Sequence, residues 1–441
     1  MMERRVLLVS YYFPPLGGVG AFRALKLARY LPRLGWKPWV LTPEPAYYYC
    51  IDPTLSREID ESVRVIRTES LDPFRLFGRV KRPSKESATD GAGKDPLFGR
   101  ITRAAKGVNT WLFVPDNKIG WLPFASRAGT RLVREEKIDL VYTINVPQTC
   151  HLIGRAIKRA TGVAWVADFR DAWTANPDLP APTPLHRFLS GRLERSVLRE
   201  ADGVVAVNDT IRGILAGAAG GRGGRFTTIH NGYDPEDFDG LRKIESDRFT
   251  MVFVGTFHRR TDPRLLLEPF RRCFESGRID RGKARLVVVG AQSERVREAA
   301  RELRLEKDVE FTGFLAHRES LAWMASADLL LQVIAAGPGS EQIVSGKLYE
   351  YMAAGRPVLT IGPPGEARVM VERLRLGARA EVTRPDEVAG ALAAAYEAWR
   401  SGTLRHDPDR PGIEELSFPR QTEALDRFLR SVLSPGAPHG F

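Results

Sequence analysis

Short apolar runs alternate with stretches of helical spacing along most of the chain. A short run that is apolar throughout predicts a strand buried on both faces, as in a parallel sheet covered by helices. In the first half we expect strands at 5–10, 38–42, 63–66, 139–143, 164–168 and 201–207. In the second half we expect strands at 250–255, 285–290, 309–314, 328–332 and 357–361. Because helical spacing fills most of the intervening segments, the pattern predicts an α/β fold with doubly wound parallel sheets.

The strand, glycine turn and helix pattern begins twice, and a length of 441 residues is typical of two domains. The stretch 213–225 is expected to contain a glycine-rich surface loop. The expected organisation is a first domain at 1–235 with an irregular insertion at about 70–110, a linker at 236–248, a second domain at 249–415 and a last helix within 416–441.

The stretch from Ser345 to Val358 predicts a short helix followed by a buried strand. Ser345 is a good N-cap, and Gly355 suits the left-handed stop after the last turn. The first turn of such a helix presents free N–H groups and a partial positive charge, which suit a phosphate. Lys347 adds a full charge there, and Glu350 shares its face and suits ribose hydroxyls. The alternative is an ordinary surface helix with a Lys347–Glu350 ion pair.

Polar residues also follow the expected strand at 164–168. Asp168, Arg170 and Asp171 stand at its carboxyl end, where ligands bind in open α/β sheets. The alternative is a structural Arg–Asp pair. His151 is a further candidate because it begins a helix directly after a strand end.

Composition narrows the classes of function. The net charge of +12 suits nucleic acid, an anionic membrane or an anionic substrate. No nucleic-acid-binding motif accompanies this charge, so we expect no nucleic-acid partner. Three widely spaced cysteines indicate neither a disulfide framework nor a zinc site, which fits a reducing cytoplasm. No apolar run approaches the length of a membrane span, and the first one is too short for a signal peptide.

The stretch 74–106 is strongly basic, with nine Lys or Arg against three Asp or Glu. Aromatic residues stand among these charges, a combination that suits anionic lipid headgroups. We therefore expect a peripheral position at the inner face of the cell membrane. The alternative is a long solvated loop.

Two stretches resemble a known family. SGKLYEYMAAGRPV (345–358) resembles the donor-binding motif of retaining GT-B glycosyltransferases of the family 4 type, and YFPPLGGVGAFRALKLARYLPRLGW (12–36) resembles their N-terminal loop and helix. The resemblance implies two Rossmann-like domains facing each other across a cleft, with the last helix crossing back to the first domain. It also implies a nucleotide-diphosphate sugar donor, retention at the anomeric carbon, and a glycan or lipid-linked acceptor in cell-surface polysaccharide assembly. No metal and no further cofactor is expected.

The resemblance assigns roles to individual residues. It places Lys347, Arg259 or Arg260, and the helix start at Ser345 and Gly346 at the leaving diphosphate. It places His151, Gly17, Gly18 and either Glu341 or Gln342 at the donor sugar, and Glu350 at the ribose. Other donor-side candidates are Asn231, Gly255, Thr256, Gly313 and Phe314, the last two near the base. The acceptor-side candidates are Asp116, Trp121, Asp168, Arg170 and Asp171.

The sequence departs from the family pattern at two points. Members typically carry Glu-x7-Glu, but the position eight residues before Glu350 is Gln342, with Glu341 beside it. Many members have a basic residue after the first glycine of the second domain, where this chain has Thr256. The pair Asp237 and Asp239 matches the DxD pattern of metal-dependent transferases, which we interpret as a chance match.

Two functions from other classes remain as alternatives. A nucleotide-sugar epimerase would use the same fold and donor pocket without an acceptor. A catalytically inactive GT-B partner protein would explain the missing first carboxylate. The motifs do not specify the base, the sugar, the acceptor or the oligomeric state.

Overall fold

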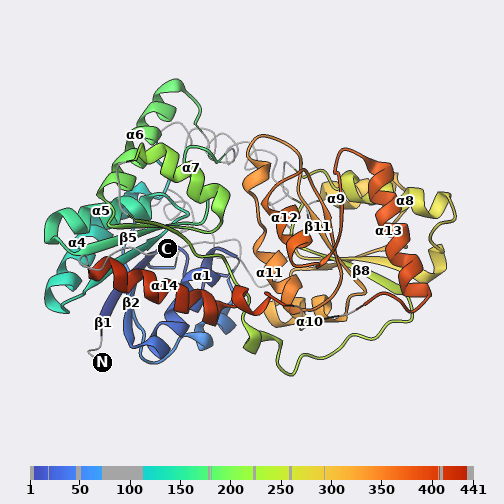
Figure 1. Cartoon of the computed structure of the whole chain (residues 1–441), viewed down its shortest axis with the longest axis horizontal. Coiled ribbons are helices and arrows are strands. Elements are labelled where there is room, and N and C mark those ends of the chain that lie inside the picture. The colour runs from blue at the N-terminus through green and yellow to red at the C-terminus, as the bar shows by residue number, and fades with distance from the viewer. Residues whose placement is uncertain are drawn as a thin grey trace, which may run out of the picture. The chain divides into compact units, whose positions relative to one another are not determined.

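The computed structural model describes most of the chain in two compact units (Figure 1). The described residues are 4–17, 19–45, 51–71, 113–176, 179, 181–221, 225–257, 261–292, 294–405, 407 and 411–434. The N-terminal unit comprises the described residues up to Asn231 together with those from Phe418 onward, and the C-terminal unit spans Gly232–Ser417. Each unit is described by itself.

The N-terminal unit is built on a seven-stranded parallel sheet in the order β3-β2-β1-β4-β5-β6-β7. Its strands are β1 (Arg4–Ser10), β2 (Trp36–Pro43), β3 (Arg64–Thr68), β4 (Leu140–Ile144), β5 (Ala164–Phe169), β6 (Gly203–Ala206) and β7 (Arg225–Thr228). Its helices are α1 (Val19–Tyr30), α4 (Leu122–Glu135), α5 (Thr149–Thr161), α6 (Pro184–Glu200), α7 (Asp209–Ala219) and α14 (Phe418–Leu433).

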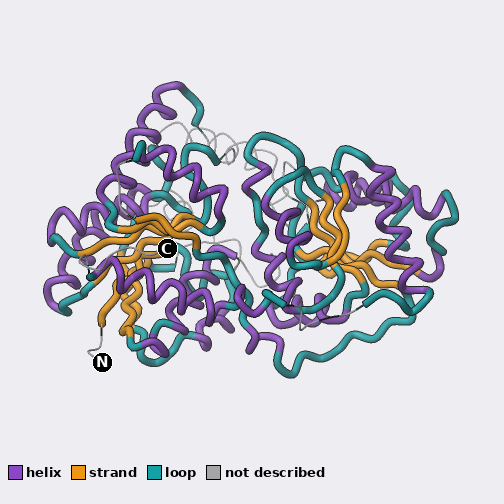
Figure 2. The backbone as a smooth tube through the Cα atoms, viewed as in Figure 1, coloured by secondary structure: helices purple, strands orange, loops and turns teal. Residues whose placement is uncertain are grey.

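The C-terminal unit repeats this plan with a six-stranded parallel sheet in the order β10-β9-β8-β11-β12-β13. Its strands are β8 (Phe249–Val254), β9 (Ala284–Val289), β10 (Val309–Gly313), β11 (Leu329–Val333), β12 (Val358–Ile361) and β13 (Gly377–Ala380). Its helices are α8 (Arg264–Glu275), α9 (Glu294–Glu302), α10 (His317–Ser326), α11 (Gly346–Ala353), α12 (Glu366–Arg373) and α13 (Pro385–Arg400). Figure 2 shows the strands of each unit gathered centrally with helices around them.

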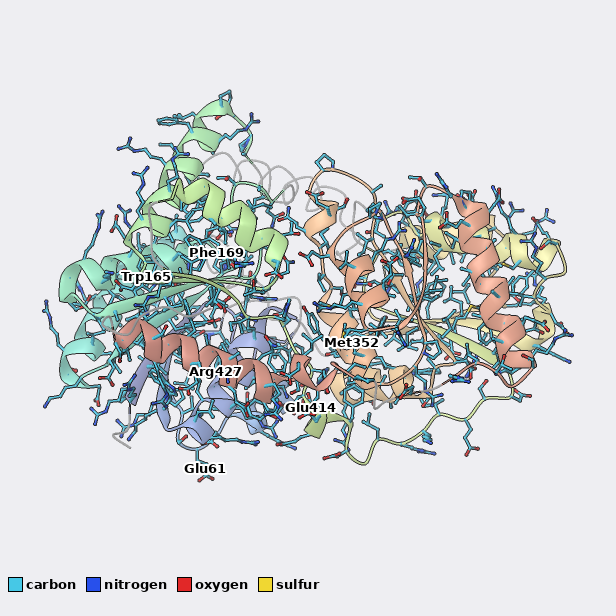
Figure 3. All side chains as sticks on the ribbon, viewed as in Figure 1. Glu61, Trp165, Phe169, Met352, Glu414 and Arg427 are labelled. Atoms are coloured by element: carbon cyan, nitrogen blue, oxygen red, sulfur yellow. The ribbon has the colours of Figure 1, made fainter. Side chains whose placement is uncertain are left out.

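The central strands of both sheets are buried on two faces, which explains why their sequences are mostly apolar. On β1, Leu7 and Val9 belong to one apolar core, while Val6 and Leu8 belong to the core on the opposite face. The side chains of Trp165 and Phe169 on β5, labelled in Figure 3, are fully buried in the first of these cores. The predicted α/β fold with doubly wound sheets is therefore confirmed.

Three elements differ from the sequence expectation, and one of them is β7, a half-buried strand at Arg225–Thr228 that no apolar run predicts. Only a loop was expected within 213–225, and α7 occupies the first part of this stretch up to Ala219. Asn208 caps this helix, and Ile211, Leu215 and Ala219 form a buried stripe, so burial of one face outweighs the low helix propensity of the exposed glycines. Strand β13 has no apolar run because Gly377 to Arg379 are exposed.

The last helix, α14, packs on the N-terminal unit. Trp36 Nε1 donates a hydrogen bond to Asp426 Oδ1 at 2.6 Å, and Arg430 Nη2 donates to the Leu34 carbonyl at 2.8 Å. Phe428 packs against Gly203, where an added Cβ would lie only 2.9 Å from its ring. The chain thus returns to its first unit after completing the second.

Gly154 on α5 is a sharp test of packing between this helix and the sheet. A Cβ at this position would lie 2.4 Å from Trp165 Nε1 and 2.5 Å from Thr143 Cγ2. We expect Gly154→Ala to lower the free energy of unfolding by about 1–3 kcal/mol, because the core must shift to admit the methyl group. Urea denaturation followed by tryptophan fluorescence measures the change. The matched control is Gly213→Ala on α7, where nothing lies within 4 Å, and equal effects of both substitutions would contradict the prediction.

Candidate functional site

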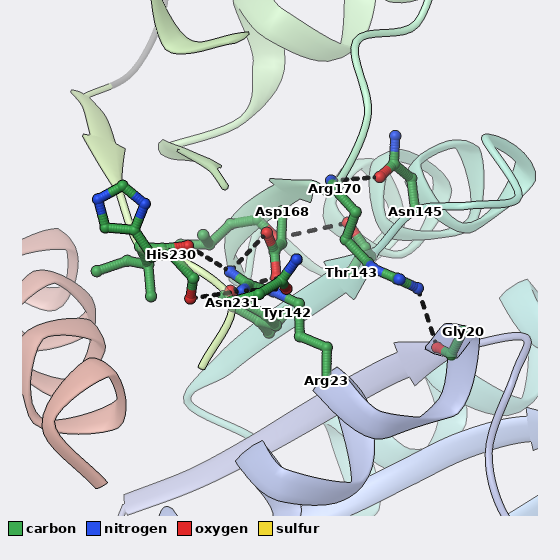
Figure 4. Close-up of polar contacts among 11 residues, drawn as sticks. Gly20, Arg23, Tyr142, Thr143, Asn145, Asp168, Arg170, His230 and Asn231 are labelled. Carbon is green, nitrogen blue, oxygen red and sulfur yellow. Dashed lines mark hydrogen bonds and ion pairs between the residues drawn. The ribbon is translucent and has the colours of Figure 1, made fainter. Parts of the chain in front are cut away.

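A buried ion pair lies at the carboxyl end of β5 in the N-terminal unit (Figure 4). Arg23 of α1 donates to Asp168 from Nε at 2.6 Å and from Nη2 at 3.1 Å. Tyr142 of β4 donates its hydroxyl to Asp168 Oδ2 at 2.8 Å. All three side chains are almost completely enclosed. Burial raises the pKa of Tyr142, and the neighbouring Asp168 raises it further.

Arg23 also joins this pair to the segment that follows β7. Its guanidinium donates to the carbonyls of Ile229 and His230, each at 3.0 Å, and to Asn231 Oδ1 at 3.2 Å. Burial alone would lower the pKa of Arg23, but Asp168 and Tyr142 hold it above its usual value. Asp168 therefore takes part in a structural ion pair, with Arg23 rather than with its neighbour Arg170.

Arg170 and Asp171 connect three element ends. The Arg170 side chain donates to the Gly20 carbonyl at 3.0 Å, and its backbone N–H donates to Asn145 Oδ1 at 2.6 Å. Asn145 in turn donates to the Asp171 carbonyl at 3.0 Å and to Gln148 Oε1 at 2.9 Å. These bonds tie the start of α1 to the ends of β4 and β5.

His151 lies in the first turn of α5 and is fully buried. Its Nδ1 lies 2.8 Å from Thr143 Oγ1, which also accepts a hydrogen bond from Trp165 Nε1 at 2.9 Å. Burial lowers the pKa of His151 to about 3, so the imidazole is neutral near pH 7. Within the part of the chain that the structure describes, His151 Nε2 has no hydrogen-bond partner. A neutral ring with one uncommitted nitrogen suits a polar, uncharged ligand group.

The other candidates in this unit take part in local structure. Asp116 accepts from Thr149 N at 2.9 Å and from Thr149 Oγ1 at 2.7 Å, which caps α5, and burial raises its pKa. Trp121 is fully buried, and its Nε1 donates to Thr68 Oγ1 at 2.8 Å. Gly17 is buried in the turn before α1, whereas Gly18 lies outside the described residues.

In the C-terminal unit, Glu350 of α11 is held between two basic side chains. Lys347 Nζ donates to Glu350 Oε2 at 3.0 Å, and His317 Nε2 of α10 lies 2.9 Å from Glu350 Oε1. Burial would raise the pKa of Glu350, but Lys347 and His317 together lower it from 4.5 to about 2. Glu350 is therefore ionised at neutral pH.

Helix α11 begins as expected, with Ser345 Oγ accepting from Lys347 N at 3.2 Å. Its own Leu348, Tyr349, Tyr351 and Met352 form the buried face, and the Lys347–Glu350 ion pair of the alternative interpretation is also present. Tyr351 accepts from Val254 N at 3.0 Å and donates to the Leu331 carbonyl at 3.2 Å. These bonds fix α11 to the end of β8 and the middle of β11, with Gly346 and Lys347 in its first turn.

Glycines gather at the carboxyl ends of β8, β9 and β10. A Cβ at Gly290 would lie 2.7 Å from the Gly255 carbonyl oxygen, and Gly290 N donates to the Gly313 carbonyl at 2.9 Å. Gly313 has φ of +73°, a left-handed conformation that glycine adopts readily. Thr256 Oγ1 donates to the Ala291 carbonyl at 3.0 Å, and Phe314 is 57% exposed. The strand ends thus meet closely and leave one aromatic ring open to solvent.

The remaining candidates of this unit divide by exposure. Glu341 is exposed and Gln342 is buried in the single turn Ser340–Gln342. Arg259 and Arg260 lie outside the described residues. Asp237 lies in the turn Pro235–Phe238, and the Asp239 carbonyl accepts from Arg318.

Over the described ranges, no three His, Cys, Asp or Glu side chains gather as a metal site would require, and no helix is long and apolar enough to cross a membrane.

The sequence reasoning missed three side chains. Arg23 lies within a predicted helix and Tyr142 within a predicted strand, and nothing in the local pattern marks their side chains as part of a polar site. His317 stands 33 positions from Glu350, and only the packing of α10 beside α11 brings them together. The sequence marks His317 only by its position at the start of a predicted helix, just after the turn at Gly313.

Two family models match the chain. The model described as "Glycosyl transferase 4-like domain" matches residues 17–232, and the model described as "Glycosyl transferases group 1" matches residues 248–398. Together the matches span most of both units. No curated protein matches the chain in sequence.

Several solved structures share the fold. A sucrose-phosphate synthase from Thermosynechococcus elongatus has a TM-score of 0.69 at 15% identity, covering 98% of this chain and 100% of that one. A glycosyltransferase from Rickettsia africae has a TM-score of 0.65 at 14% identity, covering 98% and 99%. The trehalose-6-phosphate protein from E. coli bound with UDP-2-fluoro glucose has a TM-score of 0.61 at 11% identity, covering 97% and 99%. At these identities the likeness shows the fold.

The lowered pKa of Glu350 predicts a pH-dependent contribution to stability. Because the folded pKa lies below the ordinary value, the contribution is complete above about pH 4.5 and is lost as the pH falls toward 2. We expect Glu350→Gln to lower the free energy of unfolding by about 3 kcal/mol at pH 7, and by progressively less below pH 4.5. Urea denaturation between pH 7 and pH 3 measures the difference.

The matched control is Glu298→Gln at an exposed position on α9, where we expect little change at any pH. A destabilisation by Glu350→Gln that stays constant across this range would contradict the assigned pKa.

Proposed function

The chain belongs to the GT-B glycosyltransferases, and from this premise we propose that it transfers a sugar from a nucleotide-diphosphate donor to an acceptor with retention at the anomeric carbon. The observation that carries the proposal is the first turn of α11, where Lys347 and His317 flank the ionised carboxylate of Glu350. This arrangement offers a cation, the positive end of a helix dipole and a carboxylate within one turn of helix. A diphosphate and a ribose require these groups.

The chemical difficulty of the reaction is the negative charge that develops on the leaving diphosphate. In the proposed mechanism Lys347 and the start of α11 stabilise that charge, with Arg259 or Arg260 as a second cation. These groups are protein cations and helix N–H groups, so we propose that transfer needs no metal ion. No carboxylate is assigned as a nucleophile.

Glu350 is suited to the ribose even though both its oxygens are already engaged. A carboxylate has about four lone-pair sites, so hydrogen bonds from Lys347 and His317 leave acceptor capacity for two ribose hydroxyls. The side chain retains 14% exposure, which gives a ligand access to it. The exposed ring of Phe314 beside Gly313 offers a surface for the base.

The donor sugar is assigned to His151 and to the Gly17–Gly18 turn. Because the pKa of His151 is lowered to about 3, the ring would bind a sugar hydroxyl as a neutral group. Gln342 is preferred over Glu341 as a further sugar contact, since Gln342 is the buried member of the two. An amide supplies both a donor and an acceptor for hydroxyls.

The acceptor is proposed to be a glycan or a lipid-linked sugar, in the assembly of a cell-surface polysaccharide. The surplus of six positive charges in the stretch 74–106 supports a position at the inner face of the cell membrane, where a lipid-linked acceptor would be met. This stretch lies outside the described residues.

Incubation with a panel of nucleotide sugars and candidate acceptors tests the proposal. We expect acceptor-dependent release of free nucleotide diphosphate from one donor, with the sugar retained in its anomeric configuration, and we expect the rate to survive excess EDTA. An epimerase would convert the sugar without an acceptor, and an inactive partner protein would change nothing. Loss of activity with EDTA that magnesium or manganese restores would instead assign a role to Asp237 and Asp239.

Lys347→Ala tests the electrostatic step. Loss of one contact to a developing charge typically costs about 3 kcal/mol, so we expect kcat to fall at least a hundredfold. Glu350→Gln is expected to raise KM more than it lowers kcat, because ribose contacts hold the ground and transition states alike.

Stability must be measured alongside, because Lys347 and Glu350 are only 20% and 14% exposed and their pair is not a surface pair. Lys283→Ala, at an exposed position of the same unit, is the matched control and should leave turnover unchanged. A folded Lys347→Ala enzyme with the turnover of the parent would remove Lys347 from the mechanism.

A further inference from the structure

The first turns of α6 expose a cluster of large apolar side chains. Leu185 is 61% exposed, Phe188 is 58% exposed and Leu189 is 36% exposed. The other large apolar side chains that the described residues expose are Ile51, Leu71, Phe314, Ile343 and Val369, each on a different segment. In Figure 1 the first turns of α6 extend past the other helices of the N-terminal unit. We call Leu185, Phe188 and Leu189 the α6 apolar tip.

The second half of α6 anchors the helix, so that the tip is held in a defined orientation. Gly191, Glu194, Val197 and Leu198 are buried. Thr183 caps the helix by accepting from His186 N at 3.2 Å. The apolar tip is therefore an ordered face of a packed helix.

Arginines continue the face on which the tip lies. Arg192, Arg195 and Arg199 follow Leu185 by seven, ten and fourteen positions, spacings that return to the same side of an α-helix. All three are exposed, as is Arg187 in the second turn. At about 1.5 Å per residue, these charges begin roughly 10 Å from Leu185 and end roughly 21 Å from it.

The acidic side chains of α6 are engaged with other groups, and among the arginines of this face Arg195 interacts with the buried Glu194. Glu194 is buried and accepts hydrogen bonds from Thr174. Glu200 is paired with Arg155 and Arg159 of α5. Over the described residues, Arg187, Arg192 and Arg199 form no salt bridge. The exposed face of α6 thus combines an apolar tip with positive charge alone.

The geometry points to the surface of an anionic lipid bilayer as the partner of this face. An apolar tip of two turns matches the depth of about 5–10 Å to which interfacial helices enter the headgroup and acyl boundary. The arginines that follow would then lie at the level of the lipid phosphates, which they bind with charge-assisted hydrogen bonds. The inference adds a second, ordered contact to the membrane position under the proposed function, and it depends on no step of sugar transfer.

Vesicle co-sedimentation of the full chain tests this assignment. The probes are vesicles of pure phosphatidylcholine and vesicles with about 30% phosphatidylglycerol. The tip variant is Leu185→Ser, Phe188→Ser and Leu189→Ser together, and the charge variant is Arg192→Gln, Arg195→Gln and Arg199→Gln together. The matched controls are Val369→Ser, and Arg242→Gln, Arg373→Gln and Arg375→Gln together, all at exposed positions of the C-terminal unit.

We expect the parent to bind the anionic vesicles and not the neutral ones, with binding that weakens as salt rises. The charge variant should lose about fivefold in partition coefficient for each arginine, on the order of a hundredfold in total. The tip variant should lose at least tenfold, and both controls should bind like the parent.

Three outcomes would overturn the inference. The first is equal vesicle binding by the parent and both α6 variants. This includes the case in which a variant of the basic stretch, Lys81→Glu, Arg82→Glu and Lys85→Glu together, abolishes binding and the α6 variants do not. A lower thermal stability of the tip variant with unchanged vesicle binding is another, since the tip would then be covered by the chain itself. A change in oligomeric state by sedimentation velocity with unchanged vesicle binding would assign the face to a second copy. Because vesicle binding is measured without a donor, its failure is separate from any failure of sugar transfer.

Discussion

The ion pair between Arg23 and Asp168 is the interaction on which the N-terminal unit depends. Two charges removed from water are tolerated only when their hydrogen-bonding capacity is used, and here Tyr142 and three acceptors after β7 complete it. Removing one partner of such a pair typically costs about 3–5 kcal/mol, because the other charge stays buried. The pair therefore fixes α1, β4, β5 and the segment at Asn231 relative to one another, and with them the turn that precedes α1.

The two units use their polar groups in different ways. In the N-terminal unit most of the expected site residues form hydrogen bonds within the unit or are buried. Asp116 caps a helix, Arg170 donates to the Gly20 carbonyl, and His151 is fully enclosed. In the C-terminal unit the charged groups of α11 stay partly exposed above a buried face. The accessible charge chemistry is therefore concentrated at α11.

The sequence predicted the fold well because a strand buried on both faces is apolar throughout, and most strands of both sheets are of this kind. It failed where burial does not follow that rule: β13 is largely exposed, and α7 carries two glycines on its outer face. Within α11, spacing alone predicted the Lys347–Glu350 contact. The third partner, His317, comes from another helix, and no local pattern reports a contact made by tertiary packing. Arg23 escaped notice for the same reason, since a helical arginine is usually at the surface.

The two departures from the family pattern bear on the alternative of an inactive partner protein. Gln342 stands where a carboxylate is typical of the family, and Thr256 stands where a cation is typical. One negative and one positive charge are therefore missing, and the summed formal charge of these two positions equals that of a typical member. Glu350 is itself paired with Lys347 and hydrogen-bonded to His317, and the proposed mechanism uses Lys347 as the cation near the start of α11. A pocket that had lost only its carboxylate would bind the diphosphate more tightly in the ground state as well as in the transition state, which does not speed the reaction. Because the amide of Gln342 can still donate to and accept from sugar hydroxyls, the missing carboxylate alone is no argument against catalysis.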